Sequence, residues 1–531
     1  MANALPSQIF DQFKGIREYN GINHSGQISA LTCKNVELFK TDIGNGTGIK
    51  TVAGDSEFLT LPSDFKAIKN FTSIQNNNTY MFIYGESDSE RRGALFVYDY
   101  LGNLSEITLD FNFTKTGNCN GLTMAYGEFD IFVFTNGEEA ITIQTGFDIE
   151  EFKPTYATRK IEALWNKGLE TGLKPLKWLS MAAWNGQLVI ASQYGVHGSH
   201  KNDIYTWNDN VNGVEDSWYI EFGKKVTAVH TFSTGLFIFT NSDCSHLNTT
   251  PNDTTNARLQ NVAMNGCFGF ESIVAHDTYL FFYDDNQKGI FYIQMTDTGQ
   301  TRPTGSVSKE IQSFFTEDIK SLKMYSCIYA NYNEIWLLIN DKVIIYDYIN
   351  QEFIERVMHK ITGLCMYKNR PYVCNGNRIL AEKTSVNYDT ITGEYYRAEY
   401  KTSIINMGSN SNLKKQKTPL LLVLNENAVN NFYVEITANF KEKNPKKITL
   451  KVGNEGIWAA DDETEATSNM LWDSMVWASD DYYRKRVVEI STPQTWYTMS
   501  IKFFTKEQGD GFNIVAMELK RLKEKTKTKG R

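Results

Sequence analysis

The residues best suited to bind a metal lie in the segment WNDNVNGVED. Asn208, Asn210 and Asn212 alternate along it and Gly213 follows, a spacing similar to that of a calcium-binding loop. The twelfth position of such a loop carries a glutamate that binds the ion with both oxygens, whereas this sequence has Tyr219 there. The pattern favours an asparagine-rich loop over a calcium site, so we expect no bound metal.

Histidines could provide a second site. His197 and His200 are three residues apart outside any helical pattern, with no cysteine or third histidine nearby in the sequence, which favours a polar surface loop over a metal pair. His276 and Asp277 are adjacent. Because neighbouring strand residues point to opposite faces, we expect them to form a hairpin turn rather than a catalytic dyad.

Common catalytic motifs are missing from the sequence. It has no G-x-S-x-G, H-E-x-x-H, G-x-x-x-x-G-K-[ST] or strand-borne G-x-G-x-x-G motif. The glycine-rich segment from Gly44 to Gly48 has no helix after it, so a turn is favoured over a phosphate loop. Among 62 acidic residues, some will meet by chance, and pairs alone do not identify a glycosidase. We therefore expect no catalytic residues, no cofactor and no enzymatic activity.

The cysteines are odd in number, scattered and never spaced C-x2-C. This argues against a disulfide framework and a zinc knuckle, and favours buried, reduced thiols that behave as small apolar groups. The seven cysteines are Cys33, Cys119, Cys244, Cys267, Cys327, Cys365 and Cys374.

Composition points to strands as the elements that position these residues. Aromatic residues make up 13% of the 531-residue chain, which has only 10 prolines, and flat or β-branched side chains suit a pleated surface. The one segment with helical spacing, from Thr158 to Trp184, is interrupted by Gly168, Gly172 and Pro175. Neither a long apolar run nor a signal peptide is evident, so we expect no membrane span and folding in a cytosol.

One pattern recurs along the chain: an apolar strand, a short turn with Asn, Asp or Gly, and a second apolar strand. Its spacing of about 37 to 57 residues is that of propeller blades with four strands each. The sequence therefore predicts a β-propeller of six to eight blades, with about seven modules. The central strands of these modules start near Tyr80, Ile131, Leu188, Leu236, Leu280, Ile335 and Tyr372.

The order of domains follows from where this pattern begins and ends. We expect an N-terminal arm at 1–27, the propeller at 28–390 and a β-sandwich-like platform at 391–519. The segment from Ile28 to Lys40 is the candidate strand to complete the last blade. In the platform, Phe432, Val434 and Ile436 alternate with polar neighbours, which is typical of strands with one buried face.

Two groups of residues are candidates for interaction. Trp458, Trp472 and Trp477 lie in a polar stretch and could contact partners or, alternatively, pack inside the sandwich. The basic tail at 520–531 could bind DNA phosphates, although a solvated or partner-bound extension is favoured. Its seven basic residues are Lys520, Arg521, Lys523, Lys525, Lys527, Lys529 and Arg531, and with one acidic residue the tail has a net charge of +6. Because the whole chain has a net charge of -8, the remainder without the tail carries about -14.

The order of parts resembles the tail hub or nozzle β-propeller proteins of short-tailed bacteriophages, also called phage stabilisation or tail tubular proteins. The best matches are GCFGFESIVAHDTYLFFYDDNQKGIFYI (Gly266 to Ile293), SKEIQSFF, NEIWLLI, VIIYDYINQEFI, and the terminal RKRVVEI and GFNIVAMELKR. The glycine-rich opening of the family is only loosely present in FKGIREYNGIN, and the basic tail is extra.

The resemblance implies a structural virion protein without catalysis. Copies would form a ring, usually hexameric, below the portal and adaptor, and the ring would serve as a conduit for DNA ejection and a docking platform for fibres or other tail proteins. Localisation would be the virion, after assembly in the bacterial cytoplasm. The alternative is a carbohydrate-binding or carbohydrate-degrading propeller for receptor recognition, with two close carboxylates and stacked aromatics in a pocket; a host scaffold propeller is less favoured because WD and kelch signatures are absent.

Overall fold

The computed structural model of the chain describes most of its length. The described residues are 3–4, 8–17, 27–41, 46–162, 164–165, 174–175, 177–193, 195–207, 217–233, 235–251, 258–295, 301–303, 305–316, 318–329, 332–357, 360–385, 397–405, 413–416, 419–425, 431–439, 446–453, 456–461, 485–493, 495–507, 510–519 and 522–525. They belong to two compact units. The larger comprises Glu57–Asp341 and His359–Ala381, and the smaller comprises Met1–Ser56, Lys342–Met358 and Glu382–Arg531.

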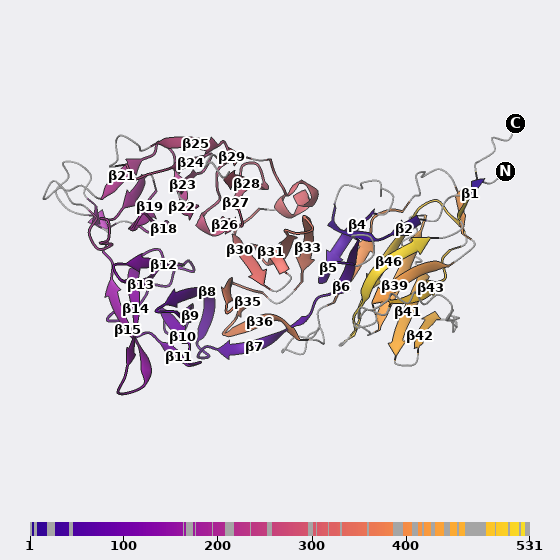
Figure 1. The fold of residues 1–531 in the computed structure, drawn as a ribbon, viewed down its shortest axis with the longest axis horizontal. Helices are drawn as coiled ribbons and strands as arrows, with labels where there is room; N and C mark the ends of the chain where they lie inside the picture. The colour runs from indigo at the N-terminus through magenta and orange to yellow at the C-terminus, as the bar shows by residue number, and fades with distance from the viewer. Residues whose placement is uncertain are drawn as a thin grey trace. The chain divides into compact units, whose positions relative to one another are not determined.

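The larger unit is built from four-stranded antiparallel sheets whose strands follow chain order. Five such sheets are complete within its described residues, and Figure 1 shows them following one another around a common centre. Their strands are β8 (Phe65–Gln75), β9 (Asn78–Ser87), β10 (Arg92–Tyr98), β11 (Leu104–Glu106); β12 (Asn120–Tyr126), β13 (Phe129–Thr135), β14 (Ala140–Asp148), β15 (Lys153–Lys160); β18 (Ser180–Trp184), β19 (Gln187–Ala191), β20 (Gly195–Gly198), β21 (Trp218–Glu221); β22 (Val226–Phe232), β23 (Gly235–Thr240), β24 (Cys244–Leu247), β25 (Leu259–Ala263); and β26 (Ile273–His276), β27 (Tyr279–Asp284), β28 (Gly289–Met295), β29 (Thr301–Pro303).

Two further modules complete the set. One begins with the hairpin of β30 (Leu322–Tyr329) and β31 (Tyr332–Ile339), and the other contains β34 (Gly363–Tyr367), β35 (Arg370–Asn375), β36 (Arg378–Ser385) and β7 (Gly54–Thr60). Short elements between the modules are β16 (Leu164–Trp165), β17 (Lys174–Pro175) and the 3-10 helices η1 (Phe270–Ser272) and η2 (Lys309–Phe315). The described residues thus form a propeller of seven modules. All seven central strands expected from the sequence are the second strands of these modules.

The turns inside the modules have the chemistry that tight hairpins require. Asn185 and Gly186 join β18 to β19 with φ of 51° and 74°. Asn76 and Asn77 join β8 to β9 with φ of 51° and 61°. Type I′ turns need two successive residues with positive φ, and Asn and Gly tolerate this backbone best.

The second strand of each module is apolar because it is buried on both faces. In β13, Phe132 and Phe134 pack with the preceding module, whereas Ile131 and Val133 pack with the following one. The same division occurs in β9, β19 and β23. Each module therefore obtains its core from its neighbours.

The ring closes with a strand other than the expected one. β7 ends only a few residues before β8 and joins the last module, where the Leu61 amide donates to the Asn377 carbonyl over 2.7 Å. Leu59 and Leu61 are buried in one cluster with Tyr367 and Tyr372. The prediction that Ile28 to Lys40 completes this blade is wrong: those residues are used in the smaller unit.

The smaller unit is also all-β and draws strands from three parts of the chain. Near the N-terminus, β2 and β6 pair with β46, and β4 pairs with β37. Its strands are β1 (Asn3–Ala4), β2 (Gln8–Phe10), β3 (Gln12–Ile16), β4 (Gln27–Lys34), β5 (Val36–Lys40), β6 (Thr47–Thr51), β32 (Lys342–Asp347), β33 (Glu352–Arg356), β37 (Glu399–Thr402), β38 (Leu413–Gln416), β39 (Leu420–Asn425), β40 (Phe432–Ala438), β41 (Lys446–Gly453), β42 (Gly456–Asp461), β43 (Lys485–Ile490), β44 (Thr495–Trp496), β45 (Met499–Phe504), β46 (Asn513–Leu519) and β47 (Leu522–Lys525).

This arrangement differs from the linear order of domains expected from the sequence. Residues 1–56 belong with the C-terminal strands rather than to a separate arm and the propeller. Local alternation shows that a strand has one buried face, but it does not show which distant strand it pairs with. The expected alternation itself is confirmed in β40, where Phe432, Val434 and Ile436 are buried and the residues between them are half-buried.

The other sequence expectations can be located in the fold. All seven cysteines are buried and free, as expected. The ends of the segment with helical spacing form β15 and β18, and Thr47 and Gly48 of the glycine-rich segment open β6. In these segments the weak helical or turn preference of the sequence is overridden by pairing with neighbouring strands.

The contact between two aromatic side chains of the first two modules provides a test of the core between them. The rings of Phe82 and Phe132 stack with centroids 4.2 Å apart and both are fully buried. We expect Phe82→Ala to lower the free energy of unfolding by about 3–5 kcal/mol, because it leaves a cavity between two modules. Phe129→Ala, at an exposed position of β13, is the matched control and should change it by less than about 0.5 kcal/mol. Urea denaturation followed by tryptophan fluorescence measures both, and equal losses would contradict the packing described.

Candidate functional site

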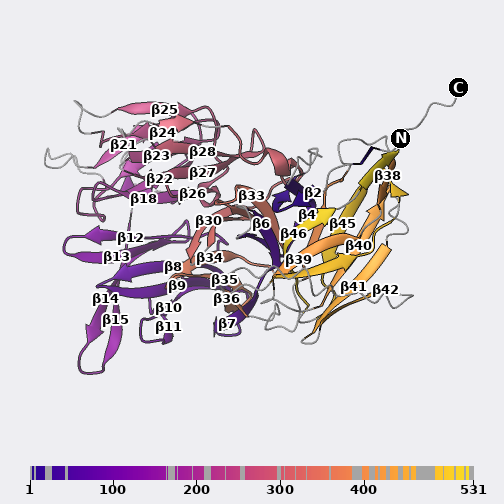
Figure 2. The same cartoon turned by 45° about the vertical axis from the view of Figure 1, so that its right-hand side comes forward.

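Two cavities of the larger unit lie where its modules meet. A cavity of about 550 Å³ is lined by residues of β8, β12, β18, β22, β26, β30 and β34, the first strands of all seven modules. A second cavity of about 510 Å³ shares Asn120, Phe270 and Glu271 with it. We call the two together the axial cavities. Figure 2 shows several of these first strands on the inner side of their sheets.

Three charged side chains meet between the axial cavities. Lys69 Nζ lies 3.0 Å and Lys323 Nζ 3.6 Å from the same oxygen, Oε1, of Glu271. Lys69 comes from β8 and lines the first cavity, Lys323 comes from β30 and lines the second, and Glu271 comes from η1 and lines both. We call these three residues the axial triad.

The axial triad is largely removed from solvent. The side chains of Lys69, Glu271 and Lys323 are 12%, 15% and 14% exposed. Burial by itself raises the pKa of Glu271, but the two ammonium groups outweigh it and hold the pKa of this carboxyl below its usual value. Glu271 is therefore ionised at neutral pH, and the triad carries one surplus positive charge.

Neutral groups surround the two ammonium groups. Lys69 Nζ lies 5.4 Å from the ring centroid of Phe270, 5.5 Å from that of Phe71 and 5.8 Å from that of Tyr325. Lys323 Nζ donates a hydrogen bond to the Thr362 carbonyl over 2.9 Å. Aromatic faces and carbonyls stabilise a cation without neutralising it.

A polar network near the first cavity joins two neighbouring modules. His276 Nδ1 lies 2.8 Å from Ser326 Oγ, and its Nε2 contacts Asn333 Oδ1. Because the amide oxygen can only accept, Nε2 donates to it and Nδ1 accepts from the hydroxyl. Burial lowers the pKa of His276, so the imidazole is neutral. This order of groups is the one that activates a serine, but here it links β26 to β30 and we assign it a structural role.

That network was not foreseen from the sequence. The expected turn is confirmed, since Asp277 has φ of 53° between β26 and β27. The partners of His276 lie 50 and 57 residues further along the chain. Lys69, Glu271 and Lys323 were likewise missed, because no local spacing indicates that three modules turn these residues toward one point.

The other candidate metal ligands do not converge. His197 is buried in β20, where burial lowers its pKa to about 4, whereas His200 is half-buried and its Nδ1 contacts the Lys201 carbonyl. The surface-loop expectation is therefore wrong for His197, because its strand is covered on both faces. Asn208, Asn210 and Asn212 lie outside the described residues. Within the described ranges, no group of three His, Cys, Asp or Glu side chains could hold a metal ion.

The residues expected to interact with partners are only partly described. The backbone of Trp458 lies in β42 opposite Lys451 of β41. Lys523 and Lys525 lie in β47, which pairs with β38, so this part of the basic tail is a strand and not a free extension. The others lie outside the described residues: Trp472, Trp477, Lys520, Arg521, Lys527, Lys529 and Arg531.

The sheets and the axial cavities define the class of this protein: a seven-module β-propeller joined to a second all-β unit. No family model matches the chain, and no curated protein matches it. Among the described residues, no helix has the length and apolar character needed to cross a membrane.

Solved structures resemble the chain only distantly. One is the extracellular domain of a hybrid two component system from B. thetaiotaomicron, with 8% identity, a TM-score of 0.38, and coverage of 77% of this chain and 46% of that one. A second is BBS1N in complex with ARL6DN, with 11% identity, a TM-score of 0.40, and coverage of 62% of this chain and 97% of that one. A third is a quinonprotein alcohol dehydrogenase-like protein from Bacteroides thetaiotaomicron VPI-5482, with 10% identity, a TM-score of 0.31, and coverage of 60% of this chain and 68% of that one. The chain thus spans under half the length of the first. All these TM-scores are below 0.5, so the propeller assignment rests on the sheets alone.

The axial triad makes stability depend on pH. We expect Glu271→Gln to lower the free energy of unfolding by about 3 kcal/mol at pH 7, because two buried ammonium groups lose their counter-ion. Since the folded pKa of Glu271 lies below the unfolded one, its contribution is present above the unfolded pKa of about 4.3 and is lost as the pH falls through the folded pKa. The free energies of unfolding of wild type and Glu271→Gln should therefore become more similar at acidic pH.

Urea denaturation at pH 7, 4 and 3 measures this difference in the free energy of unfolding. The control is Glu138→Gln, which breaks the exposed pair between Glu138 and Lys177 and should cost less than about 1 kcal/mol at every pH. A difference between wild type and Glu271→Gln that stays constant down to pH 3 would contradict a pKa of Glu271 that is lower in the folded than in the unfolded protein.

Proposed function

We propose that this protein is a structural component of a bacteriophage virion, a hub or nozzle ring in the tail of a short-tailed phage. Copies assemble in the bacterial cytoplasm into a ring, expected to be hexameric, which joins the portal and adaptor to other tail proteins. The proposal is supported by the propeller with its second all-β unit and by the sequence resemblance. The segments that carry the resemblance form η1 with β26 to β28, η2, β31, β32 with β33, β43 and β46.

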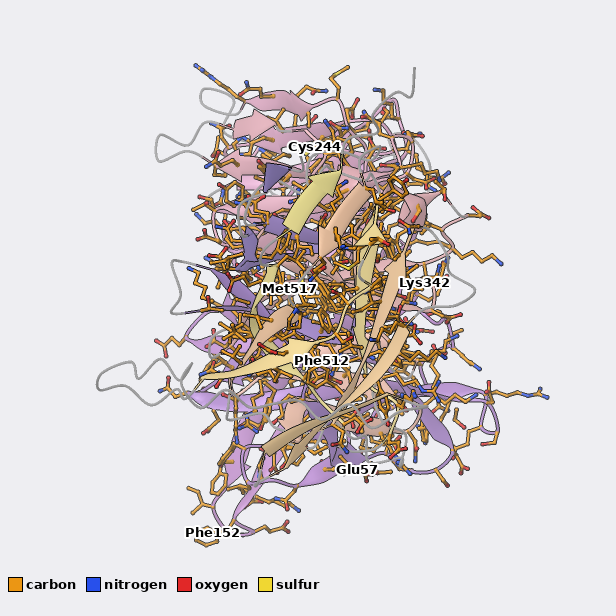
Figure 3. All side chains as sticks on the ribbon, turned by 90° about the vertical axis from the view of Figure 1, so that its right-hand side faces the viewer. Glu57, Phe152, Cys244, Lys342, Phe512 and Met517 are labelled. Carbon is orange, nitrogen blue, oxygen red and sulfur yellow. The ribbon has the colours of Figure 1, made fainter. Side chains whose placement is uncertain are left out.

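The observation that carries the proposal is an exposed apolar tip on the hairpin of β14 and β15. Phe147, Ile149 and Phe152 are 45%, 75% and 74% exposed. The hairpin projects from the larger unit in Figure 1, and Phe152 lies at its end in Figure 3. Large apolar side chains gathered on a projecting element mark a contact with another protein.

The occupant that fits this hairpin tip is a neighbouring copy of the same chain. The tip also carries Asp148, Glu150 and Glu151, and the C-terminal stretch from Lys520 to Arg531 has a net charge of +6. A ring closes through heterologous contacts, in which one surface of a copy meets a different surface of the next. An acidic, apolar tip on one copy and basic residues on another satisfy that requirement.

DNA in this proposal passes through the lumen of the ring and not through the propeller. The axial cavities, of about 550 and 510 Å³, have the size of small-molecule pockets. A B-form duplex, whose major groove alone is about 12 Å wide, does not fit. The acidic character of the chain outside its last twelve residues suits a passage through which DNA slides without adhering.

Native mass measurement tests the ring. We expect sixfold rings by light scattering and negative-stain class averages, either with the protein alone or after mixing with the portal or adaptor encoded by the same genome. Because a ring forms by association of separate copies, the fraction of protein in rings should increase with protein concentration. A stable 60.6 kDa monomer that ignores both partners would exclude the proposal.

Variants at the hairpin tip test the contact itself. The double substitution Ile149→Ser and Phe152→Ser should leave the free energy of unfolding of the single chain within about 0.5 kcal/mol of wild type, because both side chains are exposed. It should weaken ring formation by at least tenfold, since apolar anchors dominate interfaces. Leu101→Ser, at another exposed apolar position, is the matched control. Rings that form equally well from the double variant and the control would show that the tip is not the contact.

A further inference from the structure

The axial triad leaves a positive charge without a counter-ion inside the propeller. Two ammonium groups face one carboxylate, and both approach the same oxygen atom of Glu271. An isolated buried charge is costly, and proteins neutralise it by pairing or by changing protonation. The other contacts of Lys69 and Lys323, three aromatic rings and one carbonyl, are neutral.

Charged residues elsewhere on the cavity walls do not remove the surplus. Besides the triad, Lys177, Lys320 and Glu138 line the second cavity, and Lys177 pairs with Glu138 over 3.1 Å. The walls of the axial cavities therefore carry four lysines and two glutamates. This positive region lies in a chain whose net charge is -8.

Space for a ligand adjoins the two ammonium groups. Lys69 lines the cavity of about 550 Å³ and Lys323 the cavity of about 510 Å³, and Glu271 stands between them. Pockets for small molecules commonly enclose about 300–1,000 Å³.

We propose that the axial cavities bind a small oxyanion, a carboxylate or phosphate group, through the ammonium groups of Lys69 and Lys323. The anion supplies the negative charge that the axial triad lacks, and Glu271 limits its affinity because the two anions repel each other. Bound anion links β8 and β30, which belong to two modules, with η1, which directly precedes β26 of a third, and so stabilises the closed propeller. The site is separate from the hairpin tip, and binding does not depend on the proposed place of the protein in a phage tail.

Calorimetric titration at low ionic strength tests the site, with inorganic phosphate and citrate as probes and glucose as the neutral control. We expect wild type to bind one of the anions saturably, at one per chain, and glucose not at all. Lys69→Met and Lys323→Met each keep an apolar side chain of similar length and should weaken binding by at least tenfold. Lys360→Met removes an exposed lysine that lines neither cavity and is the matched control that should bind as wild type does.

Glu271→Gln gives an effect of the opposite sign. Removing the internal anion leaves both lysines to the ligand, so this variant should bind about tenfold more tightly. The same anion should raise its thermal midpoint toward that of wild type, because ligand binding stabilises the folded state. A preference for citrate or for phosphate identifies the group as a carboxylate or a phosphate. No saturable binding by either wild type or Glu271→Gln, or binding that both lysine variants retain, would overturn the proposal.

Discussion

The whole propeller depends on strands that are buried on both faces. A second strand such as β13 sends alternate side chains into the cores on either side of it, so no module has a complete core of its own. The ring therefore has to close, and it does so with β7, which brings Leu59 and Leu61 into the cluster of the last module. A strand of modest apolar character is sufficient there, because backbone pairing and two leucines complete a surface that already exists.

The contacts at the centre of the propeller differ in kind from those between its modules. Between modules the contacts are apolar and stacked, as in the pair of Phe82 and Phe132. Toward the axis, first strands from every module converge and leave space that side chains do not fill. Charged residues can be retained there only where partners are within reach, and Lys69, Glu271 and Lys323 supply one another with such partners. The proposed anion site thus lies at the axis, whereas the proposed assembly contact lies at the projecting hairpin of β14 and β15.

Much of the fold could be predicted because its signals are local. Continuous apolar runs such as IFVF and LFIF indicated buried strands, and Asn and Gly indicated the tight turns between strands. The candidate site was far less predictable. Asp277 was correctly expected in a turn, yet the partners of its neighbour His276 come from the next module. The expected role of Ile28 to Lys40 failed for the same reason: an apolar strand specifies its buried face but not its distant partner.

The sequence by itself determined the class of the fold, limited the number of blades to between six and eight, and indicated the buried state of the cysteines, because each depends on periodicity or composition within a few dozen residues. Only the tertiary structure decided which strand closes the ring, that β1, β2, β4 and β6 pair with C-terminal strands, and that three charges meet at the propeller axis. Those outcomes depend on contacts between residues up to several hundred positions apart. Their geometry is set by the closure of the sheets, and no local pattern encodes it.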